Sequence, residues 1–297
     1  MKIVSLLPSA TEIVFALGLG DELVGRSFEC DHPPAARAVP VVSGTALPTE
    51  APLTARQLDT EVSTRVAADE PIYTLDAALI RATAPDVILA QDLCRVCAVP
   101  SGAVDEALAT IGCRAEVISL DPGRLDEVID CIGVVGRATG TEATAETVMT
   151  GLRSRVEAVR RRVTGRPRPR VFVLEWPDPP FNAGHWVPDM VDAAGGLPVL
   201  AVAGERSRRL SWEEIDGEAI DVTIFSPCGF DLDGAVAQAA SFLDRPEVAG
   251  LGRVVAVDAN AHFSCPGPRV VDGVELLADL LHPDAPGAVP EGARVLR

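Results

Sequence analysis

The longest hydrophobic pattern of the chain lies at residues 142–163, where apolar side chains recur at helical spacing. One stripe has steps of four, four, three and four residues: Val148, Leu152, Val156, Val159 and Val163. These steps place the stripe on one face of an α-helix about 30 Å long. The segment 165–169 is rich in proline and glycine, so we expect the helix to end there and to join two domains.

Short apolar runs alternate with helical stretches on both sides of this helix. The expected strands lie at 3–7, 23–25, 86–90 and 116–120, and then at 170–175, 222–226 and 254–258. Such alternation is typical of βαβ units in a parallel sheet. We therefore predict the α/β class, with two doubly wound α/β lobes at 1–141 and 170–297 that are joined by one long bridging helix at 142–163.

Two sequence patterns predict where helices begin. Ser9 and Glu12 have the spacing of a capping box directly after the first expected strand. Ser211 and Glu214 repeat the same spacing in the second lobe. In such a box the hydroxyl accepts from one backbone amide while the carboxylate accepts from another. We expect a helix to start at each position.

The composition of the chain limits the classes of molecule that it could bind. The 297 residues include 26 Lys and Arg against 43 Asp and Glu, a formal charge of −17. Such a surface repels phosphate backbones, so we expect no nucleic-acid partner. No window holds the ~20 apolar residues of a membrane span, so we expect no membrane insertion. The start, residues 1–8, lacks the long apolar core of an export signal, so we expect a cytoplasmic protein.

Five of the seven cysteines follow an expected strand: Cys30, Cys94, Cys97, Cys228 and Cys265. Loops at the carboxyl ends of parallel strands form the ligand crevice of open α/β sheets. We therefore expect the first four, together with His185, to converge on the cleft between the lobes. Four thiolates there would suit zinc or an iron–sulfur cluster.

Other interpretations of these thiols remain open. A single C-x-x-C motif, here Cys94 and Cys97, is equally typical of two small, partly buried side chains. The same pair would also suit a redox protein, although a thioredoxin-like context is absent. Ligand capture without any bond between thiol and metal is a further alternative.

Aromatic residues gather in one short stretch of a chain that is only 4% aromatic. An aromatic wall beside polar groups suits a flat organic ligand, and an imidazole in a loop could bind cobalt, iron or a polar ligand group. The candidate ligand-binding residues are Glu175, Trp176, Phe181, His185, Trp186, His262 and Arg269. The alternatives are a locally hydrogen-bonded loop histidine and ordinary core tryptophans.

Three segments carry a family resemblance: IVSLLPSATEIVFALGLGD at 3–21, APDVIL at 84–89 and GRVVAVD at 252–258. They resemble the opening, the first-lobe strand and the late second-lobe strand of the cobalamin and iron-siderophore substrate-binding proteins of ABC importers. The resemblance covers most of residues 1–282. It implies two α/β lobes bridged by one long helix, with the ligand held between them.

Some cysteine- and histidine-bearing segments are not general features of the exported members of that family: 29–31, 91–97, 184–186, 227–231 and 264–269. Together with the chain start, they indicate a cytoplasmic branch of the family. Whether an ABC permease is a partner stays open at this point.

Two functional hypotheses follow. The first is a non-enzymatic binder that holds cobalamin, another corrinoid or another planar, metal-bearing ligand between the lobes. The second is a cytoplasmic metalloprotein or enzyme on the same scaffold, with zinc or an iron–sulfur cluster on Cys30, Cys94, Cys97 and Cys228. The chain has no glycine-rich phosphate loop, G-x-S-x-G elbow or H-E-x-x-H motif, which favours the binder over an enzyme.

Overall fold

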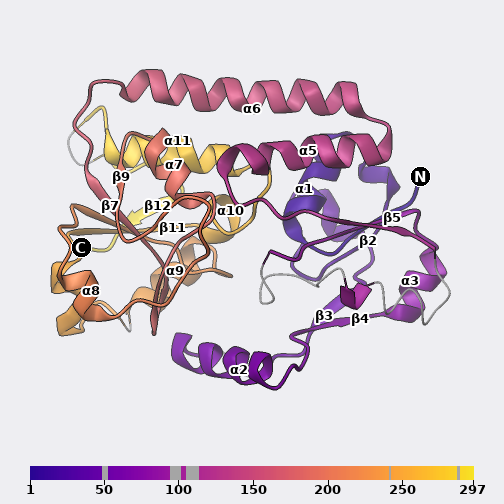
Figure 1. The fold of residues 1–297 in the computed structure, drawn as a ribbon, viewed down its shortest axis with the longest axis horizontal. Coiled ribbons are helices and arrows are strands. Elements are labelled where there is room, and N and C mark those ends of the chain that lie inside the picture. The colour runs from indigo at the N-terminus through magenta and orange to yellow at the C-terminus, as the bar shows by residue number, and fades with distance from the viewer. Residues whose placement is uncertain (49–52, 94–101, 105–113, 241, 286–287) are drawn as a thin grey trace. The chain divides into compact units, whose positions relative to one another are not determined.

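The fold is that of a computed structural model, which describes residues 1–48, 53–93, 102–104, 114–240, 242–285 and 288–297. The chain forms two compact units, which we call unit 1 and unit 2 (Figure 1). Unit 1 contains Met1–Leu53, Gln57–Pro122 and Ile129–Met149, and unit 2 contains Thr54–Arg56, Gly123–Val128 and Thr150–Arg297. Each unit holds a sheet with parallel central strands and helices, which confirms the predicted two-domain α/β class.

Unit 1 is built on four parallel strands in the order β2-β1-β5-β6. Its strands are β1 (Ile3–Ser5), β2 (Leu23–Arg26), β5 (Val87–Ala90) and β6 (Glu116–Ser119), with a separate antiparallel pair of β3 (Ser43–Thr45) and β4 (Tyr73–Leu75). The helices α1 (Pro8–Ala16) and α3 (Ala77–Thr83) connect them. The core side chains of β1 and β5, such as Val4 and Ile88, are fully buried.

Unit 2 contains a six-stranded sheet in the order β12-β11-β10-β7-β8, with β9 also paired to β7. Its strands are β7 (Arg170–Pro177), β8 (Pro180–Asn182), β9 (Leu197–Pro198), β10 (Val222–Phe225), β11 (Arg253–Val257) and β12 (Ala293–Val295). Its helices are α7 (Val187–Ala193), α8 (Trp212–Asp216), α9 (Leu232–Ala240), α10 (Ala259–His262) and α11 (Val270–Leu281). The antiparallel strands β8 and β12 flank the parallel centre.

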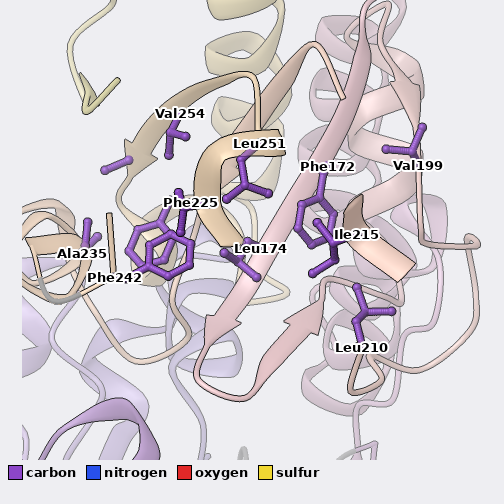
Figure 2. Packing of buried hydrophobic residues seen from close by; sticks show 13 residues of the cluster. Phe172, Leu174, Val199, Leu210, Ile215, Phe225, Ala235, Phe242, Leu251 and Val254 are labelled. Carbon is purple, nitrogen blue, oxygen red and sulfur yellow. The ribbon is translucent and has the colours of Figure 1, made fainter. Parts of the chain in front are cut away.

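The core of unit 2 is aromatic at its centre (Figure 2). Phe172, Phe225 and Phe242 have 1% or less of their surface exposed. The rings of Phe225 and Phe242 stack at 5.5 Å with an interplanar angle of 14°. Burying one such side chain stabilises the fold by roughly 1.5–3 kcal/mol. This core holds β7 and β10 in place, and both strands lead into the candidate site.

Three helices carry the chain from one unit to the other: α2 (Ala55–Ala67), α5 (Leu125–Thr139) and α6 (Glu142–Val163). The helix α6 spans the 22 residues for which the apolar stripe predicts a helix. Within unit 2 its stripe residues are buried, and its Arg155 binds Asp272 and Glu275 of α11 at 2.5 and 2.6 Å. No helix among the described residues is long and apolar enough to cross a membrane.

The two predicted capping boxes have different outcomes. Ser211 caps α8 as expected, because its hydroxyl accepts from the Glu214 amide and the Glu214 side chain accepts from the Ser211 amide. The box at Ser9 is wrong, since α1 starts at Pro8 and has Leu7 as its N-cap, without a side-chain cap. Proline suits the first helical position because its φ is preset and its missing N–H would have no helical partner there.

Candidate functional site

The candidate site of unit 2 lies where the order of its strands reverses. Strand β7 pairs with β9 on one side and with β10 on the other, and ligands of open α/β sheets bind at the carboxyl ends of strands at such a switch point. Glu175 lies near the end of β7, and Cys228 follows β10. The Cys228 amide donates to the Glu175 carbonyl over 3.1 Å, so the two strand ends lie next to each other.

Three partly exposed aromatic side chains form a row at this edge, which we call the aromatic row: Phe230, Trp176 and Phe181. The centroids of Phe230 and Trp176 are 6.2 Å apart, and Trp176 lies opposite Phe181 across the β7–β8 pair. The Arg209 guanidinium lies 5.6 Å from the Phe181 ring centroid. Aromatic faces with a cation at one end suit a planar ligand that also carries polar groups.

A hydroxyl links Glu175 to the loop that carries His185. The Ser207 hydroxyl donates to Glu175 Oε2 over 3.0 Å and accepts from the Gly184 amide, also over 3.0 Å. A Cβ at Gly184 would lie 2.4 Å from the Glu205 carbonyl oxygen, so only glycine fits this close approach. Ser207 thus joins Glu175 to Gly184, the residue directly before His185.

His185 offers a neutral imidazole. Its Nε2 atom is buried and has no hydrogen-bond partner within the described chain. Burial lowers the pKa of His185 below its usual 6.5, and the charge of Arg206 lowers it further. The ring is therefore unprotonated near neutral pH, which is the form that binds a metal ion.

A second group of predicted residues lies on other elements of unit 2. Trp186 is only 6% exposed, and its indole N–H donates to the Phe263 carbonyl over 2.9 Å. His262 ends α10, where burial lowers its pKa, and Arg269 is the N-cap of α11. Trp186 therefore has a packing role that corresponds to the core alternative for the tryptophans. Ligand binding by His262 and Arg269 stays a prediction.

The sequence analysis missed two residues of this edge, Phe230 and Ser207. Phe230 lies two positions after Cys228 in the same strand-end loop, so the rule that selected Cys228 also applied to it. Ser207 had no such signal, because its loop follows no long strand and only the fold brings it to Glu175.

The proposed four-cysteine metal site finds no support. Cys94 and Cys97 lie outside the described residues, while Cys30 belongs to unit 1 and Cys228 to unit 2. Among the described residues, no group of three or more His, Cys, Asp or Glu side chains could hold a metal ion. Cys30, Cys131, Cys228 and Cys265 form no disulfide with one another.

Cys30 is the most enclosed of these thiols. It has no exposed surface, and burial raises its pKa to about 11, although a hydrogen bond with Thr11 opposes part of the rise. Thr11 in turn donates to the Ser5 hydroxyl over 2.8 Å. Since thiolate is the reactive and metal-binding form, the thiol of Cys30 is held in its inert form.

We expect iodoacetamide at pH 8 to modify Cys228 well before Cys30 in the folded protein. Cys228 is partly exposed, whereas a thiol with a pKa of about 11 is thiolate in about one molecule per thousand at that pH. Peptide mass spectrometry of a time course measures both rates. The same reaction in urea is the control, because unfolding should bring the two rates close together. Equal rates in the folded protein would contradict the enclosed position of Cys30.

Comparisons with known proteins agree with the fold and the resemblance. The model of the family described as "Periplasmic binding protein" matches residues 3–256. A "Cobalamin-binding protein" of Halobacterium salinarum is 27% identical over 288 residues, which cover 95% of this chain and 69% of that protein. A "Vitamin B12-binding protein" of Vibrio cholerae is 26% identical over 217 residues, covering 72% of this chain and 66% of that protein.

Solved structures share the fold at lower sequence identity. A periplasmic heme-binding protein of Pseudomonas aeruginosa has a TM-score of 0.72 at 19% identity, covering 99% of this chain and 97% of that one. The periplasmic vitamin B12-binding protein of Vibrio cholerae has a TM-score of 0.67 at 23% identity, covering 94% and 96%. The family match over residues 3–256 confirms the resemblance found in the sequence, and the chain therefore belongs to the periplasmic binding protein family.

Proposed function

We propose that this chain is a non-enzymatic binding protein that holds a corrinoid, or another planar metal-bearing ligand such as haem, against the aromatic row of unit 2. The observation that carries the proposal is the row itself. Phe230, Trp176 and Phe181 stay partly exposed at the switch point of the sheet, although aromatic side chains are scarce in this chain and large apolar groups are normally buried.

The chemistry of the row matches a macrocycle. A corrin or porphyrin ring presents wide apolar faces, which aromatic side chains cover at a low cost in conformational entropy. Its rim carries amide or carboxylate groups, for which Arg209 offers a guanidinium at the end of the row. The relatives named for cobalamin and vitamin B12 support the corrinoid as the first choice.

His185 supports a metal-bearing ligand over a purely organic one. Its imidazole is neutral near neutral pH because burial and Arg206 lower its pKa, and the buried Nε2 atom has no partner among the described residues. A cobalt or iron ion at the centre of the macrocycle would accept this nitrogen after a rotation of the side chain. The heme-binding protein of similar fold makes haem the second candidate.

Titration calorimetry of the purified protein with cyanocobalamin, and separately with haemin, tests the proposal. We expect saturable binding of one of the two ligands, with cyanocobalamin as the first choice. For haemin, coordination by His185 would shift the Soret band, and a His185→Ala variant would lose that shift. Absence of binding to both ligands would overturn the proposed function and leave only the family and the fold.

A further inference from the structure

The first turn of α2 is fastened to the hairpin that carries Trp176. The indole N–H of Trp176 donates to the Ala55 carbonyl over 3.2 Å. The next residue, Arg56, donates from Nε and Nη2 to both carboxylate oxygens of Asp178, over 3.1 and 2.5 Å. Arg245 donates to the same carboxylate over 2.8 Å. We call this set of contacts the α2 clamp.

The burial and the charge of Asp178 explain why the clamp fixes the position of its partners. The Asp178 side chain is only 11% exposed, whereas those of Arg56 and Arg245 are 70% and 35% exposed. A largely buried carboxylate needs partners, and a two-point guanidinium contact fixes geometry as well as charge. Because Arg56 holds the carboxylate at two points, it fixes the position of the helix start, and with it the Ala55 carbonyl.

The contacts of the clamp form a ring that includes Trp176, the central side chain of the aromatic row. Trp176 and Asp178 are two positions apart at the end of β7, and Ala55 and Arg56 are neighbours at the start of α2. Two contacts, Trp176 to Ala55 and Asp178 to Arg56, join these two short segments. The indole plane is therefore fixed at its N–H by a segment 121 residues away in the chain.

We infer that Arg56 is a positioning residue of the ligand site. It acts through Asp178 and Ala55 to hold the indole of Trp176 in one orientation before the ligand arrives. This inference rests on the proposed function, because it assigns Trp176 to the surface that meets the ligand. Fixing a side chain in advance strengthens binding, since the cost of ordering it does not fall on the binding step.

Hydrogen–deuterium exchange of the ligand-free protein tests the clamp without any ligand. In an Arg56→Ala variant, we expect faster exchange in peptides that cover 54–60 and 174–182. Arg56→Lys keeps the charge but not the two-point contact, and should give an intermediate change. Arg65→Ala is the matched control on the same helix, because Arg65 pairs with Glu61 and Glu70. We expect it to leave 174–182 unchanged.

Calorimetric titration of the same variants with cyanocobalamin and haemin tests the positioning role. We expect Arg56→Ala to weaken binding of the accepted ligand about two- to tenfold. This range corresponds to the free-energy cost of ordering one side chain on binding. The Lys variant should recover part of this loss, and Arg65→Ala should bind like the wild type. The thermal midpoint should stay nearly constant, since Arg245 still pairs with the Asp178 carboxylate in the variant.

Three other outcomes of these experiments would each contradict a different claim. Unchanged exchange in Arg56→Ala would show that the contacts do not hold α2, and would overturn the inference while the proposed function stands. Faster exchange with unchanged affinity would overturn the positioning role alone. If wild-type protein binds neither ligand, the proposed function fails and the positioning role fails with it, whatever exchange reports about the clamp.

Discussion

Replacing Trp176 with alanine should weaken ligand binding by roughly 30-fold or more, the scale of a hot-spot aromatic residue that contributes ~2 kcal/mol or more. Trp176 is the central member of the aromatic row, with Phe230 on one side and Phe181 on the other. Its removal would therefore split the surface on which a macrocycle could lie. Calorimetric titration with cyanocobalamin and haemin gives the affinities.

Trp212 provides the matched control for this result. It is also partly buried, but its ring packs on Phe242 in the core of unit 2 at 5.9 Å and lies outside the row. We expect Trp212→Ala to lower stability while leaving affinity near the wild-type value. Trp176→Phe separates stacking from the indole N–H, since it keeps an aromatic face. Equal losses of affinity in Trp176→Ala and Trp212→Ala would argue against the row as the ligand surface.

The largest expected effect on stability is at Phe225. We expect Phe225→Ala to lower the free energy of unfolding of unit 2 by about 3–5 kcal/mol, as for other fully buried aromatic side chains. Phe225 has no exposed surface and stacks on Phe242, so the substitution removes both buried area and a ring contact. Urea unfolding followed by tryptophan fluorescence is the measurement, because all three tryptophans, Trp176, Trp186 and Trp212, belong to unit 2.

Val202→Ala is the control for this second prediction. Val202 is 58% exposed, and a substitution on the surface usually changes stability by no more than about 0.5 kcal/mol. A loss below about 1 kcal/mol in Phe225→Ala would contradict the packing described for unit 2, because a cavity that size does not collapse without cost.

Elements with a strong hydrophobic period were predictable from the sequence. The seven expected strands coincide within two residues with β1, β2, β5, β6, β7, β10 and β11. The short strands β3, β4, β8, β9 and β12 were missed, since two or three residues are too few to show a period of two. The capping box predicted at Ser9 was wrong because the helix begins one residue earlier, at the proline.

The candidate site was predictable only within one sheet. The rule that strand ends share an edge selected both Glu175 and Cys228, and the Cys228 amide donates to the Glu175 carbonyl. The same rule also grouped Cys30 with Cys228, which belong to the sheets of different units, so that grouping stays a prediction. The hydrophobic pattern identifies the strands, whereas the sheet that each strand joins depends on contacts that the pattern does not show.

Contacts between residues far apart in the sequence could not be predicted from the sequence. The partners Arg56 and Asp178 are 122 residues apart, and each has an ordinary sequence context. Arginine and aspartate are common on surfaces, so neither residue type signals its partner. Only the fold shows that these two side chains meet beside Trp176.

The interleaved path of the chain has a consequence for any attempt to express unit 2 alone. A fragment that starts at Thr150 would lack Thr54–Arg56 and Gly123–Val128, which belong to this unit. Asp189 would lose the Arg124 side chain and the Leu125 amide, which donate to it over 2.7 to 3.1 Å. A functional fragment would therefore need both short segments supplied in trans or grafted onto it, so this protein is poorly suited to division into separate recombinant modules.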